Sequence, residues 1–361
     1  MELKRIPLHD KHVEMGGKIV PFAGYEMPVR YTSDKDEHLA VRENVGVFDV
    51  SHMGEFFVRG EGALELIQRV TSNDASKLVD GQAQYSCLPN DEGGIVDDLL
   101  VYKFRENEYM LVVNASNITK DWNWIESHND FGAELTNESD NICLFAVQGP
   151  RAADVVQKIT DVDLSDIKFY HFKEGAMAGV EDVIISGTGY TGAGGFELYV
   201  DRNDALQLWE ALFEAGADIG IKPIGLGARD TLRLEMGLCL YGNDITDSTS
   251  PIEAGLGWIT KFTKDFINAE YFKKQKEEGV ERKLVGFKMI DRGIPRKDYE
   301  IMDETRLTIG NVTSGTMSPS LNHGIGLGYV EIGHHKPGTI IYIKIRGKEL
   351  KAEVTKPPFL K

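Results

Sequence analysis

The chain has 361 residues, and its 57 acidic side chains outnumber its 40 basic ones, which leaves a formal charge of −17. This balance argues against binding to nucleic acid or to anionic membrane surfaces, because both need clustered basic residues. No apolar run approaches the ~20 residues that span a bilayer, and residues 1–10 lack the apolar stretch of a secretory signal, so we expect a cytoplasmic protein of two or three domains.

Three cysteines, Cys87, Cys143 and Cys239, lie far apart in apolar surroundings. Their spacing, and that of the histidines, matches no zinc or iron–sulfur pattern. We therefore predict buried, reduced thiols and no bound metal.

Helix and strand patterns alternate irregularly over the first 265 residues, which is typical of an α+β fold. Capping residues and helical periodicity predict helices from Ser33 to about Asn44, from Gly62 to Val70, from Gly149-Pro150 onward, from an Asn203 cap to Gly216, and from about Gly227 to Gly237. Short apolar or alternating runs predict strands at 55–59, 84–88, 98–104, 109–114, 143–148, 183–186 and 196–200. A turn through Glu106-Asn107 joins two of these strands as a hairpin.

The tail has a different pattern. Residues 264–279 form a helical segment rich in lysine and glutamate, typical of a solvated face. Short strands with glycine and proline turns follow, at 284–289, 299–302, 325–330, 339–345 and 350–354. This pattern predicts a small β-barrel or sandwich, joined to the first part near residues 265–282.

The densest glycine cluster runs from Gly187 to Glu197. Its glycines match the spacing of a dinucleotide fingerprint, but a strand rather than a helix follows, so a phosphate loop is disfavoured. Two interpretations remain open, a tight hairpin between two strands and a turn that places Tyr190 and Glu197 around a ligand.

Two further clusters carry charged groups. Asp97 and Asp98 begin an apolar strand, where neighbours point to opposite faces, so the two cannot share one site. Either one caps a turn and the other faces solvent, or one of them is a functional carboxylate. Arg229 and Arg233 lie one helical turn apart. Either they belong to a network of charged side chains on the helix surface, or an arginine at the helix start faces an anionic or heteroaromatic ligand. Ser51-His52 fits no hydrolase pattern, and His52 is interpreted as a hydrogen-bonded core histidine.

Taken in order, these segments resemble the aminomethyltransferase (T-protein) family of the glycine cleavage system. The matching stretches are 22–28 (FAGYEMP), 45–55 (VGVFDVSHMGE), 90–102 around GGIVDDLLVY, 112–117 (VVNASN), 189–192 (GYTG), 195–198 (GFEL), 225–235, 240–244 (LYGND), 313–315 (TSG) and 356–359 (KPPF). The resemblance covers essentially the whole chain.

The resemblance implies an α+β fold with three domains in a cloverleaf around a central folate pocket. Residues 1–265 would form the folate-binding region as two intertwined lobes, the second roughly 54–140, and residues 280–361 the C-terminal β-barrel domain. It implies that Asp98 is the essential catalytic carboxylate. The folate-lining residues that it implies are Met53, Tyr85, Asn114, Tyr190, Glu197 and Arg229.

The implied reaction moves the one-carbon unit of an aminomethyl group from the lipoyl arm of H-protein to tetrahydrofolate, the co-substrate. The products are 5,10-methylenetetrahydrofolate, ammonia and dihydrolipoyl H-protein. Glycine decarboxylase and dihydrolipoyl dehydrogenase are indirect partners. A locally basic stretch, formed by Lys283, Arg292, Arg296 and Lys297, is a candidate surface for an acidic carrier.

Two other activities of related folate proteins stay as alternatives. One is a folate-dependent demethylation partner, which would need a separate flavoprotein. The other is a folate-binding protein of iron–sulfur assembly, whose Lys-Gly-Cys motif is not matched by Gly237-Leu238-Cys239, because the lysine is missing.

Overall fold

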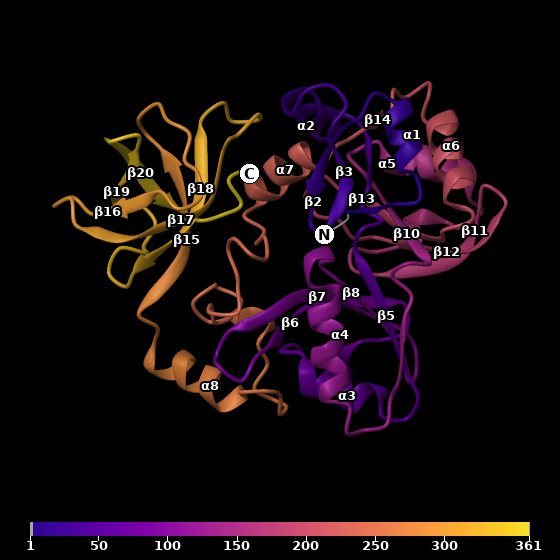
Figure 1. The fold of residues 1–361 in the computed structure, drawn as a ribbon, viewed down its shortest axis with the longest axis horizontal. Coiled ribbons are helices and arrows are strands. Elements are labelled where there is room, and N and C mark those ends of the chain that lie inside the picture. Colours follow the sequence, from indigo (N-terminus) through magenta and orange to yellow (C-terminus); the bar gives the residue numbers. More distant parts are fainter. Residues whose placement is uncertain (1–2, 361) are drawn as a thin grey trace. The chain divides into compact units, whose positions relative to one another are not determined.

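The structure is a computed structural model that describes residues 3–360 (Figure 1). The chain forms two compact units. The first comprises the described residues up to Gln68, together with Ala75–Tyr85 and Leu99–Arg229. The second comprises Arg69–Asp74, Ser86–Asp98 and the described residues from Asp230 onward. The fold is α+β, as the sequence predicts.

A six-stranded sheet carries the main core of the first unit, in the order β11-β12-β13-β10-β4-β14. Its strands are β4 (Gly46–Asp49), β10 (Ile142–Gln148), β11 (Phe172–Met177), β12 (Val180–Ser186), β13 (Gly195–Asp201) and β14 (Lys222–Pro223). Helices α5 (Ala152–Val156) and α6 (Ala205–Ala215) supply apolar side chains to the same core, where Trp209 packs on Phe145.

Helix α6 begins one residue later than the sequence predicts. Asp204 is its N-cap, and the Asn203 side chain instead donates to Asp201 at 2.8 Å. The prediction that Asn203 caps this helix is therefore wrong, because its side chain forms a hydrogen bond within the turn that follows β13. The helix predicted from Gly149-Pro150 onward also begins later than expected, because Arg151 is the N-cap of α5.

A five-stranded sheet has the order β6-β7-β8-β5-β9. Its strands are β5 (Gly54–Arg59), β6 (Gln82–Pro89), β7 (Ile95–Arg105), β8 (Glu108–Val113) and β9 (Glu134–Asn137). The predicted β7–β8 hairpin is confirmed, with Asn107 at a φ of 58° in its turn. Helices α3 (Ala63–Val70) and α4 (Ile118–Ser127) follow β5 and β8 along the chain.

The N-terminal segment of the first unit forms a three-stranded sheet and two helices. The sheet has the order β1-β3-β2. The elements are β1 (Lys4–Arg5), α1 (His9–Glu14), β2 (Lys18–Phe22), β3 (Tyr25–Arg30) and α2 (Asp34–Glu43). Ser33 caps α2 as predicted, since its hydroxyl accepts from the Asp36 N–H at 3.0 Å.

The C-terminal strands close into a six-stranded barrel, which confirms the barrel prediction. The ring order is β15-β18-β17-β16-β19-β20, with β15 (Arg282–Met289), β16 (Glu300–Met302), β17 (Thr308–Met317), β18 (Gly324–Glu331), β19 (Ile340–Ile345) and β20 (Lys348–Thr355). Phe287, Ile301 and Ile343 are fully buried in its core. The preceding helix α8 covers only Ala269–Glu278, so the helical prediction for residues 264–268 is wrong.

Helix α7 (Leu226–Met236) runs from the first unit into the second. In the second unit Arg233 and Glu235 are buried, so a solvent-exposed network on this helix is ruled out. Arg233 donates to Asp244 at 2.7 Å and to Ser314 at 2.7 Å, and Glu235 accepts from Ser320 at 2.9 Å. These bonds tie α7 to β17 and to the loop that follows β17.

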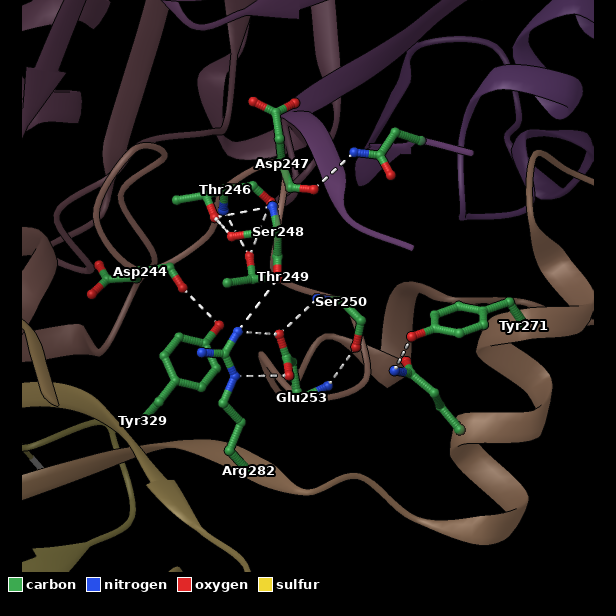
Figure 2. A network of polar contacts seen from close by, with 12 residues as sticks. Asp244, Thr246, Asp247, Ser248, Thr249, Ser250, Glu253, Tyr271, Arg282 and Tyr329 are labelled. Carbon is green, nitrogen blue, oxygen red and sulfur yellow. Dashed lines mark hydrogen bonds and ion pairs between the residues drawn. The ribbon is translucent and has the colours of Figure 1, made fainter. Parts of the chain in front are cut away.

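The loop from Asp244 to Glu253 is fixed by a polar network within the second unit (Figure 2). Tyr329 donates to the Asp244 carbonyl at 2.8 Å, and the Arg282 guanidinium donates to both oxygens of Glu253 at 3.1 Å. Ser250 and Glu253 satisfy each other's backbone N–H groups at 3.0 and 3.1 Å. The loop is thereby anchored to the beginning of the barrel.

Among the described residues, no helix is long and apolar enough to cross a membrane.

Candidate active site

Asp98 lies on β7, in the part of that strand that belongs to the second unit. Asp97 is fully buried and Asp98 is half-buried, which agrees with the alternation of side chains along a strand. The segment before Asp98 is held by the Asp244–Glu253 loop, because the Ile95 N–H donates to the Thr246 carbonyl at 3.1 Å. Tyr241 also donates to the Ile95 carbonyl at 2.9 Å.

Two thiols lie within the electrostatic reach of Asp98. Burial raises the pKa of Cys87 and of Cys239 well above the usual value, and the negative charge of Asp98 raises both further. Cys87 and Cys143 are buried as predicted, whereas Cys239 is half-buried. None of the three is joined in a disulfide within residues 3–360.

Gly187–Gly194 form the turn of an antiparallel hairpin between β12 and β13. No helix follows the glycines, so the phosphate-loop interpretation fails, as the sequence indicates. Glu197 lies on β13, opposite Ser186 of β12 and Ala146 of β10, with 6% of its surface exposed. The hairpin therefore holds a buried carboxylate just beyond its glycine turn.

The Glu197 carboxylate has two stabilising neighbours. The Thr188 hydroxyl donates to Glu197 Oε2 at 2.5 Å. Burial raises the pKa of Glu197, while the Thr188 bond and the positive charge of Arg229 act in the opposite direction.

Arg229 lies on α7, with its guanidinium carbon 4.7 Å from the centroid of the Tyr190 ring. Its Nη1 is buried and finds no hydrogen-bond partner within residues 3–360. This nitrogen is therefore available as a hydrogen-bond donor to a ligand. Tyr190, Glu197 and Arg229 thus come together in the first unit as an aromatic face, an acceptor and a donor.

His52 lies in the turn after β4 and is buried against Phe22 and Tyr25, whose rings meet it edge-on. Burial and the positive charge of Arg229 lower the pKa of His52 to about 3, so its imidazole is neutral at physiological pH. This confirms that His52 is buried, but its Nδ1 has no hydrogen-bond partner in the described part of the chain.

The other predicted pocket residues are half-buried members of the first unit. Tyr85 lies on β6, Asn114 directly follows β8, and Met53 directly precedes β5. Their roles toward folate stay predictions. The residues that the sequence prediction omitted are the hydroxyls behind Glu197: Tyr102, Ser186, Thr188 and Tyr199. Thr188 lies inside the glycine-rich stretch, two residues before Tyr190, and this position was the sequence signal that could have identified it as a site residue.

Chemically, this arrangement suits a flat heteroaromatic ligand that has both a donor edge and an acceptor edge. Glu197 accepts, Arg229 donates, and Tyr190 offers a ring face. No group of three or more histidine, cysteine or acidic side chains among residues 3–360 is arranged to hold a metal ion.

Comparisons with known proteins show the family of the chain. Residues 8–264 match the GCVT N-terminal domain, and residues 282–361 match the glycine cleavage T-protein C-terminal barrel domain. The chain is 62% identical to an aminomethyltransferase of Flavobacterium psychrophilum and 61% identical to one of Bacteroides fragilis, with 99% of this chain and 100% of each relative covered. It also matches the crystal structure of the glycine cleavage system aminomethyltransferase T from Bartonella henselae, at 35% identity and a TM-score of 0.93, over 99% of this chain and 98% of that one.

The fold and these matches define a one-carbon transferase class, and the chain belongs to the glycine cleavage T-protein family. Its activity is that of the family, the tetrahydrofolate-dependent transfer of an aminomethyl group in the glycine cleavage system.

Proposed function

We propose that the chain takes the one-carbon unit of an aminomethyl group on the lipoyl sulfur of H-protein and transfers it to tetrahydrofolate. The carbon–sulfur and carbon–nitrogen bonds of the aminomethyl group break, and two new carbon–nitrogen bonds form on the folate. The two folate N–H protons leave with the sulfur and with ammonia, so the products are 5,10-methylenetetrahydrofolate, ammonia and dihydrolipoyl H-protein. The observation that carries this assignment is the set of buried Glu197 and half-buried Arg229 and Tyr190, because it offers complementary groups to a pterin.

Each proposed residue has a role that its chemistry allows. Ionised Glu197 accepts from the pterin amino group and ring N–H, and Arg229 donates its unsatisfied Nη1 to a carbonyl or carboxylate oxygen. Tyr85 and Tyr190 pack against rings or donate hydrogen bonds. Asn114 and Met53 complete the proposed folate lining.

Asp98 is the proposed catalytic residue. As ammonia departs, positive charge develops on the one-carbon unit, and a carboxylate stabilises that charge and orients the attacking nitrogen. The thiols of Cys87 and Cys239, which feel the Asp98 charge, have pKa values raised mainly by burial, so both are protonated at neutral pH.

Replacing Glu197 by glutamine is expected to weaken tetrahydrofolate binding about 10- to 100-fold, because a charged acceptor is exchanged for a neutral one. The dissociation constant is measured by calorimetric titration of the pure protein. Glu181→Gln is the matched control, since Glu181 is exposed on the neighbouring strand β12. Equal affinity in the Glu197 and Glu181 variants would contradict the role of Glu197.

The proposed docking surface for H-protein is the basic stretch in the second unit. Arg292 is exposed, Arg296 donates to the Gly315 carbonyl at 2.9 Å, and Lys297 donates to the Gly242 carbonyl at 2.7 Å. These anchored side chains offer fixed positive charge to an acidic carrier; Lys283 at the beginning of the barrel extends the stretch.

We expect lipoylated H-protein to bind less tightly as salt rises, and Arg292→Ala combined with Arg296→Ala to weaken binding severalfold. The affinity is measured by titration at two salt concentrations. Lys336→Ala combined with Lys348→Ala, at exposed positions elsewhere on the barrel, is the control. Unchanged affinity and salt dependence in the arginine double variant would remove this surface.

A further inference from the structure

Four buried hydroxyl groups of the first unit form a cluster that joins strand β7 to the β12–β13 hairpin. Tyr102 comes from β7, Tyr199 from β13, Ser186 from the end of β12 and Thr188 from the glycine turn. The Tyr102 oxygen lies 3.0 Å from the Tyr199 oxygen and 3.1 Å from both Ser186 Oγ and Thr188 Oγ1. The cluster ends at Glu197, because Thr188 Oγ1 is 2.5 Å from Glu197 Oε2.

The hydrogen bonds of the cluster run in one direction, from donor to acceptor, toward Glu197. A hydroxyl group has one proton, and an ionised carboxylate only accepts hydrogen bonds. Thr188 therefore uses its proton on Glu197 and accepts from Tyr102, whose oxygen lies 3.1 Å away. Tyr102 in turn accepts from Tyr199. All these protons point toward Glu197, and such chains of hydrogen bonds polarise one another.

The other groups that act on this carboxylate are also defined. Arg229 of α7 is the positive group beside it, and the strands on either side of β13 place Ser186 and Ala146 opposite it. The tyrosines Tyr102 and Tyr199 have raised pKa values through burial, so both stay protonated donors. Glu55, which is buried and acts electrostatically on Tyr199, also has a raised pKa. The neutral His52 interacts with Arg229.

We propose that Thr188, supported by Tyr102, is a positioning residue that holds Glu197 in its ionised, hydrogen-bond-accepting form for tetrahydrofolate. This inference rests on the proposed function, because it concerns the folate role of Glu197. Thr188 lies behind the carboxylate and acts through it, so removing its hydroxyl changes when Glu197 is charged.

The test follows tetrahydrofolate affinity over a pH range of about 5 to 8. As pH falls through the pKa of Glu197, the carboxylate takes up a proton and affinity falls. Thr188→Val removes a hydrogen bond that lowers this pKa, so the pKa rises and the loss of affinity moves to higher pH, by about one pH unit. Thr188→Ser keeps the hydroxyl and is expected to restore the wild-type profile. Tyr102→Phe is expected to move the profile in the same direction by a smaller amount.

The outcomes separate the two proposals. If the wild-type protein does not bind tetrahydrofolate, the proposed function fails. If it binds and Thr188→Val weakens binding equally at every pH, Thr188 has only a structural role and the inference is overturned. Thermal unfolding identifies any variant that does not fold. If Thr188→Val does not fold, the pH profiles of tetrahydrofolate affinity in Thr188→Ser and Tyr102→Phe decide the inference. An unchanged pH profile in Tyr102→Phe overturns the proposed support of Thr188 by Tyr102.

Discussion

Replacing Asp98 by asparagine is expected to lower kcat by about 10²- to 10⁴-fold, the largest effect on turnover that we predict for one residue. Asparagine keeps the size of the side chain but has no negative charge to stabilise the cationic one-carbon unit and no basic oxygen to take up a proton. Because the interaction is strongest in the transition state, tetrahydrofolate affinity should stay within severalfold of wild type. Turnover is measured as methylenetetrahydrofolate and ammonia formed from aminomethylated H-protein.

Asp97 provides the matched control for this experiment. It is the adjacent carboxylate on the same strand, but its side chain is fully buried while that of Asp98 is half-buried. Asp97→Asn is expected to lower stability while the folded enzyme keeps turning over. Full turnover in Asp98→Asn, or an equal loss of kcat in both folded variants, would show that the role assigned to Asp98 is wrong.

Replacing Arg233 by methionine is expected to destabilise the second unit by about 3–5 kcal/mol. Arg233 has 1% of its surface exposed and donates to Asp244, which is fully buried and also accepts from Ser314 at 2.9 Å. Methionine fills much of the volume but leaves the Asp244 charge buried without its cation. That uncompensated charge, rather than lost packing, produces the predicted size of the effect.

The measurement is the free energy of unfolding from urea titration, together with its slope. Arg69→Met is the control, because Arg69 pairs with Asp265 at 3.1 Å at an exposed site of the same unit. That surface pair is expected to contribute about 0–1 kcal/mol. A loss in Arg233→Met no larger than in Arg69→Met would mean that the buried pair does not stabilise the unit.

Local signals in the sequence were sufficient for much of the fold. Ser33 before acidic residues predicted α2, and apolar strands around Glu106-Asn107 predicted the β7–β8 hairpin. Strand β17 was not predicted, because its glycines and small polar residues carry little β signal until their neighbours β16 and β18 pair with them.

The candidate site also combines residues that the sequence predicted with residues that it did not. The glycine-rich turn and the arginine spacing made Tyr190, Glu197 and Arg229 candidates, the family resemblance favoured them, and the structure brings these three together. The hydroxyl chain behind Glu197 was not predicted, because Tyr102 lies 97 residues from its partner Tyr199 and only long-range packing joins them. The burial of Arg233 depends on Asp244 and Ser314 in the same way, since helical spacing alone could not separate a buried pair from a surface one.

The protonation of the two thiols near Asp98 affects whether they can react with the lipoyl disulfide of the proposed carrier. The lipoyl group alternates between a dithiol and a disulfide, and a disulfide is attacked by thiolates rather than by thiols. Burial and the Asp98 charge raise the pKa of Cys87 and Cys239, so neither is an effective nucleophile at neutral pH. Burial, with a smaller contribution from the Asp98 charge, therefore keeps both sulfurs in the thiol form, which is the form that reacts poorly with a disulfide.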